Sequence, residues 1–286
     1  MASTKRQRKK ENQAARRAAL EAARRRQKRK RQTLNVAGLL VGVLLLGVAL
    51  VFIAGRGEDD SAAPPTTSTG PGVTLASLPP VPPGRAIKGD TPCPKPTGEE
   101  RASSFEKAPP MCIDPAKGYR AVFTTSAGVV KVDLDTKRTP LTANNFVVLA
   151  RYRYYDGSSF PRTDPSIDII QGGSPGTQSI SDPGPGYNIK DEGGQFSYTE
   201  GDLVMARSEG PDSASAQFFF AAGPATAQLN SQGTYVTFGK VVEGLDVLKK
   251  VLASHVDCPD PEAGGACLGG APQPPVKVDA LTIEET

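Results

Sequence analysis

The side chains that most often carry acid–base and metal chemistry are scarce in this sequence. Among 286 residues there is one histidine, His255, and there are four cysteines. A single histidine argues against a histidine-based catalytic triad and against a zinc site with several histidine ligands. The phosphate-binding pattern GxxxxGK[ST] is also absent. We therefore expect no metal site, and we interpret His255 as a surface residue near the end of a helix.

The positive net charge of +4 conceals an uneven distribution along the chain. Residues 1–33 contain fourteen of the 34 Lys and Arg but two of the 30 Asp and Glu, which leaves 20 basic and 28 acidic residues in the rest. The basic tail favours contact with anionic lipid head groups. Nucleic-acid binding is the alternative, but we do not expect it because the tail has no aromatic residue that could stack on bases.

One long stretch without charge follows the tail. Residues 34–55 read LNVAGLLVGVLLLGVALVFIAG, and a run of about 20 apolar residues is long enough to span a bilayer as a helix. A cleaved signal peptide is the alternative, although FIAGRG is a poor cleavage site. The adjacent basic residues predict a cytoplasmic amino terminus. We thus expect a single-pass protein of the cell membrane with everything after Gly55 outside.

All four cysteines follow this stretch, at positions 93, 112, 258 and 267. An even number of cysteines outside the cytoplasm indicates disulfides, and three pairings are possible. We favour Cys93–Cys112 and Cys258–Cys267, since each pair closes a short loop. The spacing is too wide for a typical zinc site.

Composition divides the outer part of the chain into three regions. Residues 56–92 are rich in Pro, Ser, Thr and Gly and predict a disordered linker. Residues 93–118 predict a small lead-in held by the first disulfide. A packed domain is expected over 119–286, which is long enough for one core.

Within 119–286 most periodic segments indicate strands. YRAVFTT and GVVKVDL, joined at SAG, predict a hairpin, and VKVDALTIEE predicts a closing strand. TPLTANNFVVLARYRY predicts a helix with Thr139 as its cap and Pro140 in the first turn. VVEGLDVLKKVLA predicts a second helix with Leu245, Leu248 and Leu252 on one face. Many short strands with two helices favour an antiparallel barrel closed at its ends by helices.

Seven motifs occur in a fixed order: NNF at 144, YYDGSSFPR at 154, IIQGGSP at 169, GPGYNIKDE at 184, GDLVMARS at 201, SASAQFFF at 213 and LNSQGTYVTFGKVVEGLDVL at 229. This order resembles the cyclophilins, the peptidyl-prolyl cis-trans isomerases, over residues 119–286. The resemblance implies a mainly β fold, a closed antiparallel eight-stranded barrel capped by two helices. With its anchor and linker, the chain is similar to membrane-anchored actinobacterial forms.

The resemblance also implies a set of site residues. Arg162 of FPR matches the catalytic arginine, and Gln171 matches the glutamine that binds the substrate backbone and helps to hold that arginine. Residues implied to bind substrate are Ile169, Met205, Ala206, Arg207, Gln217, Phe219, Leu229 and Tyr235. Ile169, Phe219 and Leu229 would form the floor for the proline ring, while Arg207 would contact substrate through its backbone. Strand alternation predicts that Phe218 and Phe220 face inward.

An arginine keeps its charge and cannot act as a general base, but it is a fixed fork of donors. The X–Pro bond interconverts slowly, with a barrier of about 20 kcal/mol. A donor aimed at the prolyl nitrogen would stabilise the twisted transition state more than the planar ground state. Such a mechanism makes and breaks no covalent bond, so we expect no cofactor. The expected partners are proline-containing polypeptides, unfolded or secreted.

Several positions depart from the family pattern. Pro161 replaces the usual histidine, Gln228 replaces the tryptophan of cyclosporin-sensitive members, and TDPSIDII between Arg162 and Gln171 is about one residue longer. Asp168 would be unfavourable in an apolar groove unless it points to solvent. These departures leave two alternatives open. One is a catalytically weak proline-peptide-binding module of the cell envelope, and the other is a structural envelope protein that uses the fold as a spacer.

Overall fold

A computed structural model describes residue 78 and residues 80–208, 210–258 and 269–286. The chain divides into two compact units, and all of these residues belong to the second one, Thr69–Thr286. The predicted basic tail, the predicted membrane span at 34–55 and most of the predicted linker lie outside the described residues. Within the described ranges, no helix is both long and apolar enough to cross a membrane.

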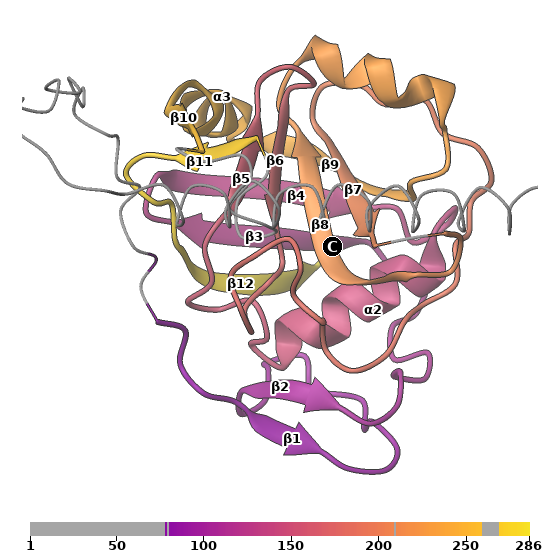
Figure 1. Cartoon of the computed structure of the whole chain (residues 1–286). Coiled ribbons are helices and arrows are strands. Elements are labelled where there is room, and N and C mark those ends of the chain that lie inside the picture. The colour runs from indigo at the N-terminus through magenta and orange to yellow at the C-terminus, as the bar shows by residue number, and fades with distance from the viewer. Residues whose placement is uncertain (1–77, 79, 209, 259–268) are drawn as a thin grey trace, which may run out of the picture. The chain divides into compact units, whose positions relative to one another are not determined.

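The main architectural element is one antiparallel sheet of ten strands (Figure 1). Its order is β10-β11-β5-β6-β8-β7-β9-β4-β3-β12. The bounds are β3 Tyr119–Thr125, β4 Gly128–Leu134, β5 Arg162–Asp164, β6 Ile169–Gly172, β7 Asp202–Arg207, β8 Ala214–Ala221, β9 Thr237–Glu243, β10 His255–Asp257, β11 Gly270–Pro272 and β12 Val278–Glu285. The mainly β fold predicted from the sequence is therefore confirmed.

The strand pairing does not show the closed eight-stranded barrel that the resemblance implied. The sheet has two more strands, and its order ends at β10 and β12. Residues just before β5 do approach the start of β12, through one bridge between Ser159 and Lys277 and three main-chain hydrogen bonds between residues 157–160 and 276–278. The contact stays short because Pro161, Pro274 and Pro275 flank it and have no N–H to donate.

The β3–β4 hairpin agrees with the prediction. Residues pair from Arg120–Asp133 to Thr125–Gly128, so Ser126 and Ala127 form the turn. Gly128 has a φ of 137°, a conformation that glycine adopts without a Cβ penalty.

The first predicted helix is α2, Pro140–Arg151, with Pro140 in its first turn as expected. Thr139 is the N-cap residue, as expected, but it makes no capping hydrogen bond, because its hydroxyl donates to the carbonyl of Asp135 instead. Glu192 takes over the capping role from 50 residues away. Its carboxylate accepts hydrogen bonds from the N–H groups of Leu141, at 3.2 Å, and Thr142, at 2.6 Å.

The second predicted helix is α3, Leu245–Ala253. Leu248 is fully buried, and Leu245 and Leu252 pack partly buried against the core, so the predicted apolar face is confirmed. In Figure 1, α3 and α2 lie on opposite sides of the strands. A 3₁₀ helix, η1 (Pro224–Ser231), follows β8.

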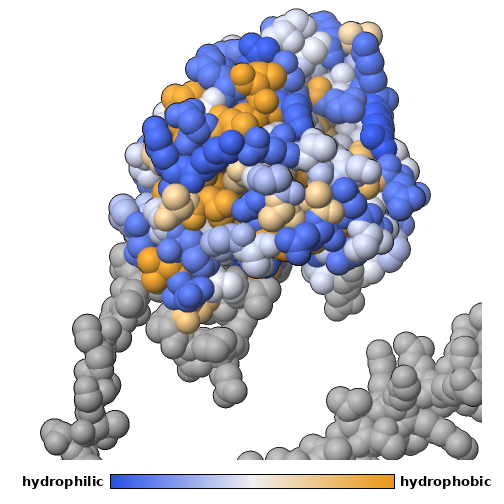
Figure 2. Space-filling model, turned by 90° about the horizontal axis from the view of Figure 1, so that it is seen from above, coloured by the Kyte–Doolittle hydropathy of each residue, from blue (hydrophilic) through white to orange (hydrophobic). Residues whose placement is uncertain are grey.

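An aromatic cluster forms the centre of the core. Phe146 of α2 meets Phe238 at a centroid distance of 5.1 Å and Phe218 at 5.8 Å. Phe123 of β3 contacts Phe220 at 5.2 Å. The surface differs from this interior: the face seen in Figure 2 is mostly hydrophilic, with apolar residues gathered in a few small clusters.

The amino-terminal segment, residues 80–118, packs as part of the same unit. It contains the parallel strands β1 (Arg85–Ile87) and β2 (Ala102–Phe105), so β1 forms within the stretch predicted to be linker. Phe105 is 1% exposed and contacts the ring of Tyr152 at 5.4 Å. Residue 119 therefore begins a strand but does not separate two packed bodies.

Arg101 fastens this segment to the loop after α2. Its guanidinium donates to the carbonyls of Arg153 and Asp156, both at 2.6 Å, and to that of Tyr154 at 3.0 Å. Burial lowers the pKa of Arg101, and the nearby Asp156 opposes this effect. The side chain thus acts as a structural tie between two backbone segments.

The disulfide prediction is confirmed for one pair. Cys93 and Cys112 are bonded, with their Cα atoms 5.3 Å apart. Cys258 is also disulfide-bonded. The predicted Cys258–Cys267 pairing itself lies outside the described residues, because Cys267 is not among them.

Candidate active site

A cavity of about 710 Å³ opens over β5, β6, β7, β8 and η1. Nine of the ten residues predicted to act on or bind a substrate line it: Arg162, Ile169, Gln171, Ala206, Arg207, Gln217, Phe219, Leu229 and Tyr235. Met205 is the exception. It is 1% exposed and belongs to the hydrophobic core.

Arg162 and Gln171 face one another across two paired strands. They are register partners in the β5–β6 pair. Nη1 of Arg162 donates to Oε1 of Gln171 at 3.1 Å. The spacing of nine residues in the sequence is therefore the length of the hairpin that brings the two side chains together.

A row of amide groups continues from this pair along the cavity. Nε2 of Gln171 donates to Oε1 of Gln217 at 2.9 Å. Nε2 of Gln217 donates in turn to the carbonyls of Ile180, at 3.1 Å, and Asp182, at 3.4 Å. Each amide donates to the next acceptor in the row, which fixes the orientation of Gln171 toward Arg162.

The apolar part of the cavity is built from three elements. Ile169 of β6, Phe219 of β8 and Leu229 of η1 line it. The ring of Phe219 meets that of Tyr235 edge to face at 5.9 Å. Phe218 and Phe220 are buried in the aromatic core instead, which confirms the predicted alternation on β8.

Arg207 stands at the cavity edge with its charge compensated. Its Nη1 donates to Oδ2 of Asp191 at 2.6 Å, and its guanidinium lies 5.2 Å from the centre of the Tyr235 ring. Tyr198 supports Tyr235 from behind, because its hydroxyl accepts the Tyr235 N–H and donates to the Tyr235 carbonyl. Burial raises the pKa of Tyr198, so the hydroxyl that does both stays neutral.

The two departures closest to the site have structural partners. Asp168 is not a cavity residue, because its Oδ2 accepts the N–H of Ala225 at 2.7 Å, in the first turn of η1. Its φ of 50° directs the chain toward that contact. Gln228 donates from Nε2 to the carbonyl of Ser166 at 2.8 Å. The unusual 163–168 stretch is thereby tied to the helix that carries Leu229.

Asp164 is a neighbour of Arg162 that the sequence did not single out. Its Oδ2 accepts from Nη2 of Arg162 at 2.9 Å. Burial alone would raise the pKa of Asp164, but hydrogen bonds from Ser166 and the charge of Arg162 outweigh it, and the pKa lies below the ordinary value. The carboxyl group is therefore ionised at neutral pH.

His255 does not reach the cavity. Its Nδ1 lies 2.7 Å from the hydroxyl of Thr163, whose side chain is on the opposite face of β5 from Arg162. His255 follows the end of α3, as expected, but its side chain is 15% exposed, so it is partly buried rather than fully on the surface. In the part of the chain that the structure describes, no three His, Cys, Asp or Glu side chains gather as metal ligands.

One wall of the cavity was not predicted. It comes from the loops around residues 180, 188, 208 and 213, and its members are Ile180, Ser181, Asp182, Pro183, Asn188, Ser208, Ser213 and Ser215. Ile167 also lines the cavity. Serine, glycine and proline dominate these loops, and such segments have no hydrophobic periodicity that would place them.

The site thus combines a fixed arginine and a glutamine with an apolar floor at one face of the sheet. Residues 120–278 match the family "Cyclophilin type peptidyl-prolyl cis-trans isomerase/CLD", and the chain belongs to this family. The predicted resemblance, and the prediction of a peptidyl-prolyl cis-trans isomerase, are confirmed at this level.

Two relatives that carry this activity in their names match the chain over most of their own length. The chain is 32% identical over 164 residues to a peptidyl-prolyl cis-trans isomerase of Acinetobacter baylyi, covering 56% of this chain and 82% of the relative. It is 36% identical over 138 residues to one of Schizosaccharomyces pombe, covering 48% and 86%. A solved cyclophilin-type isomerase of Cryptosporidium parvum aligns with a TM-score of 0.47 at 24% identity, over 59% of this chain and 99% of that one.

Proposed function

We propose that Arg162 carries the isomerase chemistry by donating a hydrogen bond to the prolyl nitrogen of the twisted X–Pro bond. The observation that carries this proposal is the guanidinium position: it lines the cavity, it is 16% exposed, and Gln171 orients it. A charged donor in a partly dehydrated site acts more strongly than one in water.

The proposed lowering of the barrier depends on how the prolyl nitrogen changes as the X–Pro bond twists. In the planar amide, the nitrogen lone pair is delocalised and accepts poorly. In the twisted state the lone pair becomes available, so the bond from Arg162 strengthens as the barrier is approached. An interaction that is stronger in the transition state than in the ground state accelerates the reaction. No proton moves to or from the arginine.

The apolar floor supplies substrate binding. We propose that the proline ring rests on Ile169, Phe219 and Leu229, while Gln171 contacts the substrate backbone. Because the floor is apolar and the donors are few, it would recognise proline and its neighbour rather than a long sequence. Proline-containing polypeptides are the proposed substrates, and the reaction requires no cofactor.

A direct test separates this enzyme from the alternative, a binding module. The catalysed exchange rate of an Ala-Pro tetrapeptide is measured by NMR exchange spectroscopy with the full chain in detergent, beside the dissociation constant from line broadening. We expect exchange far faster than the uncatalysed tens of seconds. Binding of the peptide without acceleration would support the binding module. Arg162→Ala identifies whether the acceleration depends on this donor.

We further propose that the isomerase domain acts outside the cytoplasm, on the folding of secreted or envelope proteins, and that residues 34–55 anchor it. The Cys93–Cys112 disulfide supports an oxidising location. The basic tail would contact anionic lipid on the cytoplasmic side. Protease added to bacterial protoplasts that express the chain should remove the domain and spare the tail. A protected domain would contradict this topology.

A further inference from the structure

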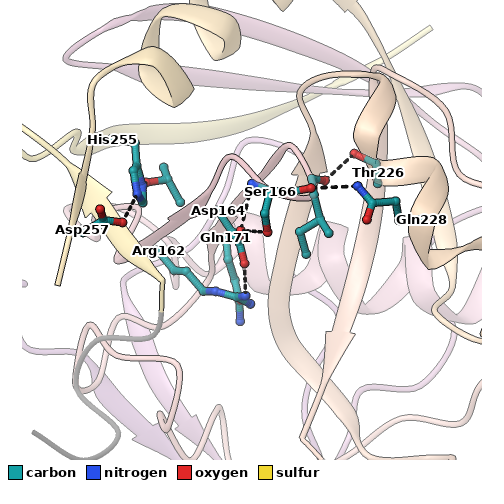
Figure 3. A network of polar contacts seen from close by, with 10 residues as sticks. Arg162, Asp164, Ser166, Gln171, Thr226, Gln228, His255 and Asp257 are labelled. Carbon is teal, nitrogen blue, oxygen red and sulfur yellow. Dashed lines mark hydrogen bonds and ion pairs between the residues drawn. The ribbon is translucent and has the colours of Figure 1, made fainter. Parts of the chain in front are cut away.

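Asp164 lies beside the proposed donor for a simple reason of strand geometry. Residues two apart on a strand project from the same face, and Arg162 and Asp164 are the two ends of β5. Their side chains form an ion pair of 2.9 Å between Nη2 and Oδ2 (Figure 3). Gln171 receives a hydrogen bond from the other terminal nitrogen. Each terminal nitrogen of the guanidinium thus donates to a side-chain acceptor.

The carboxylate that holds Arg162 is itself fixed. Its Oδ1 accepts the N–H of Ser166 at 3.1 Å and the hydroxyl of Ser166 at 2.6 Å. The main-chain carbonyl of Ser166 in turn accepts a hydrogen bond from the side-chain amide of Gln228 (Figure 3). One carboxylate oxygen is therefore anchored to a loop tied to η1, and the other is directed to the arginine.

The pair is also largely removed from water. The side chains of Arg162 and Asp164 are 16% and 19% exposed. Exposed pairs are screened and contribute little, whereas screening is weaker for a pair that is mostly covered. Arginine has several rotatable bonds, so a fixed partner reduces the orientations that its fork can take.

We propose that Asp164 is a positioning residue of the isomerase site, which holds Nη2 of Arg162 so that the guanidinium keeps one orientation toward the cavity. This inference rests on the proposed role of Arg162. Asp164 is not a cavity-lining residue, so it acts through the arginine and does not touch substrate. Its loss should therefore lower kcat, while KM, which reflects the apolar floor, changes little.

The test uses the full chain in detergent with an Ala-Pro tetrapeptide as substrate. Asp164→Ala should lower kcat by about tenfold with KM within about twofold, because misplacement of a reacting group slows catalysis strongly. Asp164→Asn retains an oxygen that can accept from Nη2 and should restore part of the rate. Asp246→Asn is the matched control, since it removes an exposed carboxylate on α3, and it should leave both constants unchanged.

A second measurement reports the restraint itself. In ¹⁵N spectra of the arginine side chains, assigned with Arg162→Lys, the two terminal nitrogens of Arg162 should give separate signals in the wild type and should merge in Asp164→Ala. Should Asp164→Ala fail to fold, Asp164→Asn gives both readouts. Wild-type kcat in both Asp164 variants, with separate nitrogen signals, would overturn the inference while Arg162→Ala still loses activity. Full activity in Arg162→Ala would remove the proposed function and this inference together.

Discussion

Two arginines, Arg101 in the amino-terminal segment and Arg162 in the cavity, show how the same side chain serves two regions of this molecule differently. Both guanidiniums are held at two or more donors. The bonds of Arg101 end on three main-chain carbonyls of the 153–156 loop. Those of Arg162 include two to side chains, Gln171 and Asp164, at the wall of a cavity.

The difference indicates where each region can tolerate change. Main-chain carbonyls keep their positions only in the folded state, so a side chain that donates hydrogen bonds to them stabilises that state. Side-chain acceptors around a cavity orient a group toward whatever enters it. Residues 80–118 should therefore govern stability with little effect on turnover, and the cavity should govern turnover with little effect on stability. Three changes in this segment test the first half of the comparison, and a fourth change, at Glu192, tests the capping of α2.

The largest effect is expected at Phe105. Phe105→Ala should lower the free energy of unfolding by about 4 kcal/mol, because it empties a fully buried site in the core. Denaturant titration measures this loss, and kcat/KM of the folded fraction should stay at the wild-type value. Met111→Ala, in the same segment but 44% exposed, is the control. A loss of turnover in the folded Phe105 variant would show that the two regions are not separable.

Removal of the disulfide should come next. The double change Cys93→Ser and Cys112→Ser opens a loop with a sequence separation of 19, and a loop of this size corresponds to about 3 kcal/mol. The shift of the unfolding midpoint in urea measures it. Equal midpoints with and without the disulfide would mean that packing alone holds the amino-terminal segment.

Arg101→Met should cost about 2 kcal/mol, because three main-chain carbonyls lose a charged donor while much of the aliphatic stem is kept. Thermal unfolding followed by circular dichroism measures the change. Arg101→Lys should recover part of the loss, since a lysine retains charge but presents no planar fork. Unchanged stability in Arg101→Met would contradict the structural role.

The smallest of these effects is expected at Glu192. Glu192→Ala should lower the free energy of unfolding by about 1 kcal/mol, since the first turn of α2 loses its acceptor and a favourable charge. Thr139→Ala tests the cap that the sequence suggested. An effect at Thr139 larger than that at Glu192 would argue against the observed capping.

The sequence predicted the parts of the fold that have periodicity. Alternation along Tyr119–Thr125 appears as alternating burial in β3, and the leucines of 245–252 form the packed face of α3. It missed β1 and β2, because β1 has three residues and lies in a proline-rich stretch. It also missed Glu192 as a cap and the partners of Arg101, since those contacts join residues at least 50 positions apart.

The candidate site shows the same division. The resemblance in motif order predicted nine residues that the fold brings to one cavity. Phe219 is one of them, whereas Phe218 and Phe220 are not, as strand alternation predicted. Met205, which the resemblance also implied to bind substrate, is buried in the core and does not line the cavity. Asp164 was overlooked because acidic residues in loops are usually solvated, and only the turn at Ser166 reveals where its carboxylate points.

The most direct test of the comparison is a matched pair of variants, Arg162→Met and Arg101→Met, each measured for kcat/KM on an Ala-Pro peptide and for the free energy of unfolding. We expect Arg162→Met to lose about a hundredfold or more in kcat/KM, the effect of removing one preorganised donor, with a smaller loss of stability than in Arg101→Met. Arg101→Met should keep its kcat/KM and lose stability. If Arg162→Met retains wild-type turnover, or if both variants lose turnover and stability in parallel, the assignment of Arg162 to chemistry and of Arg101 to structure is contradicted.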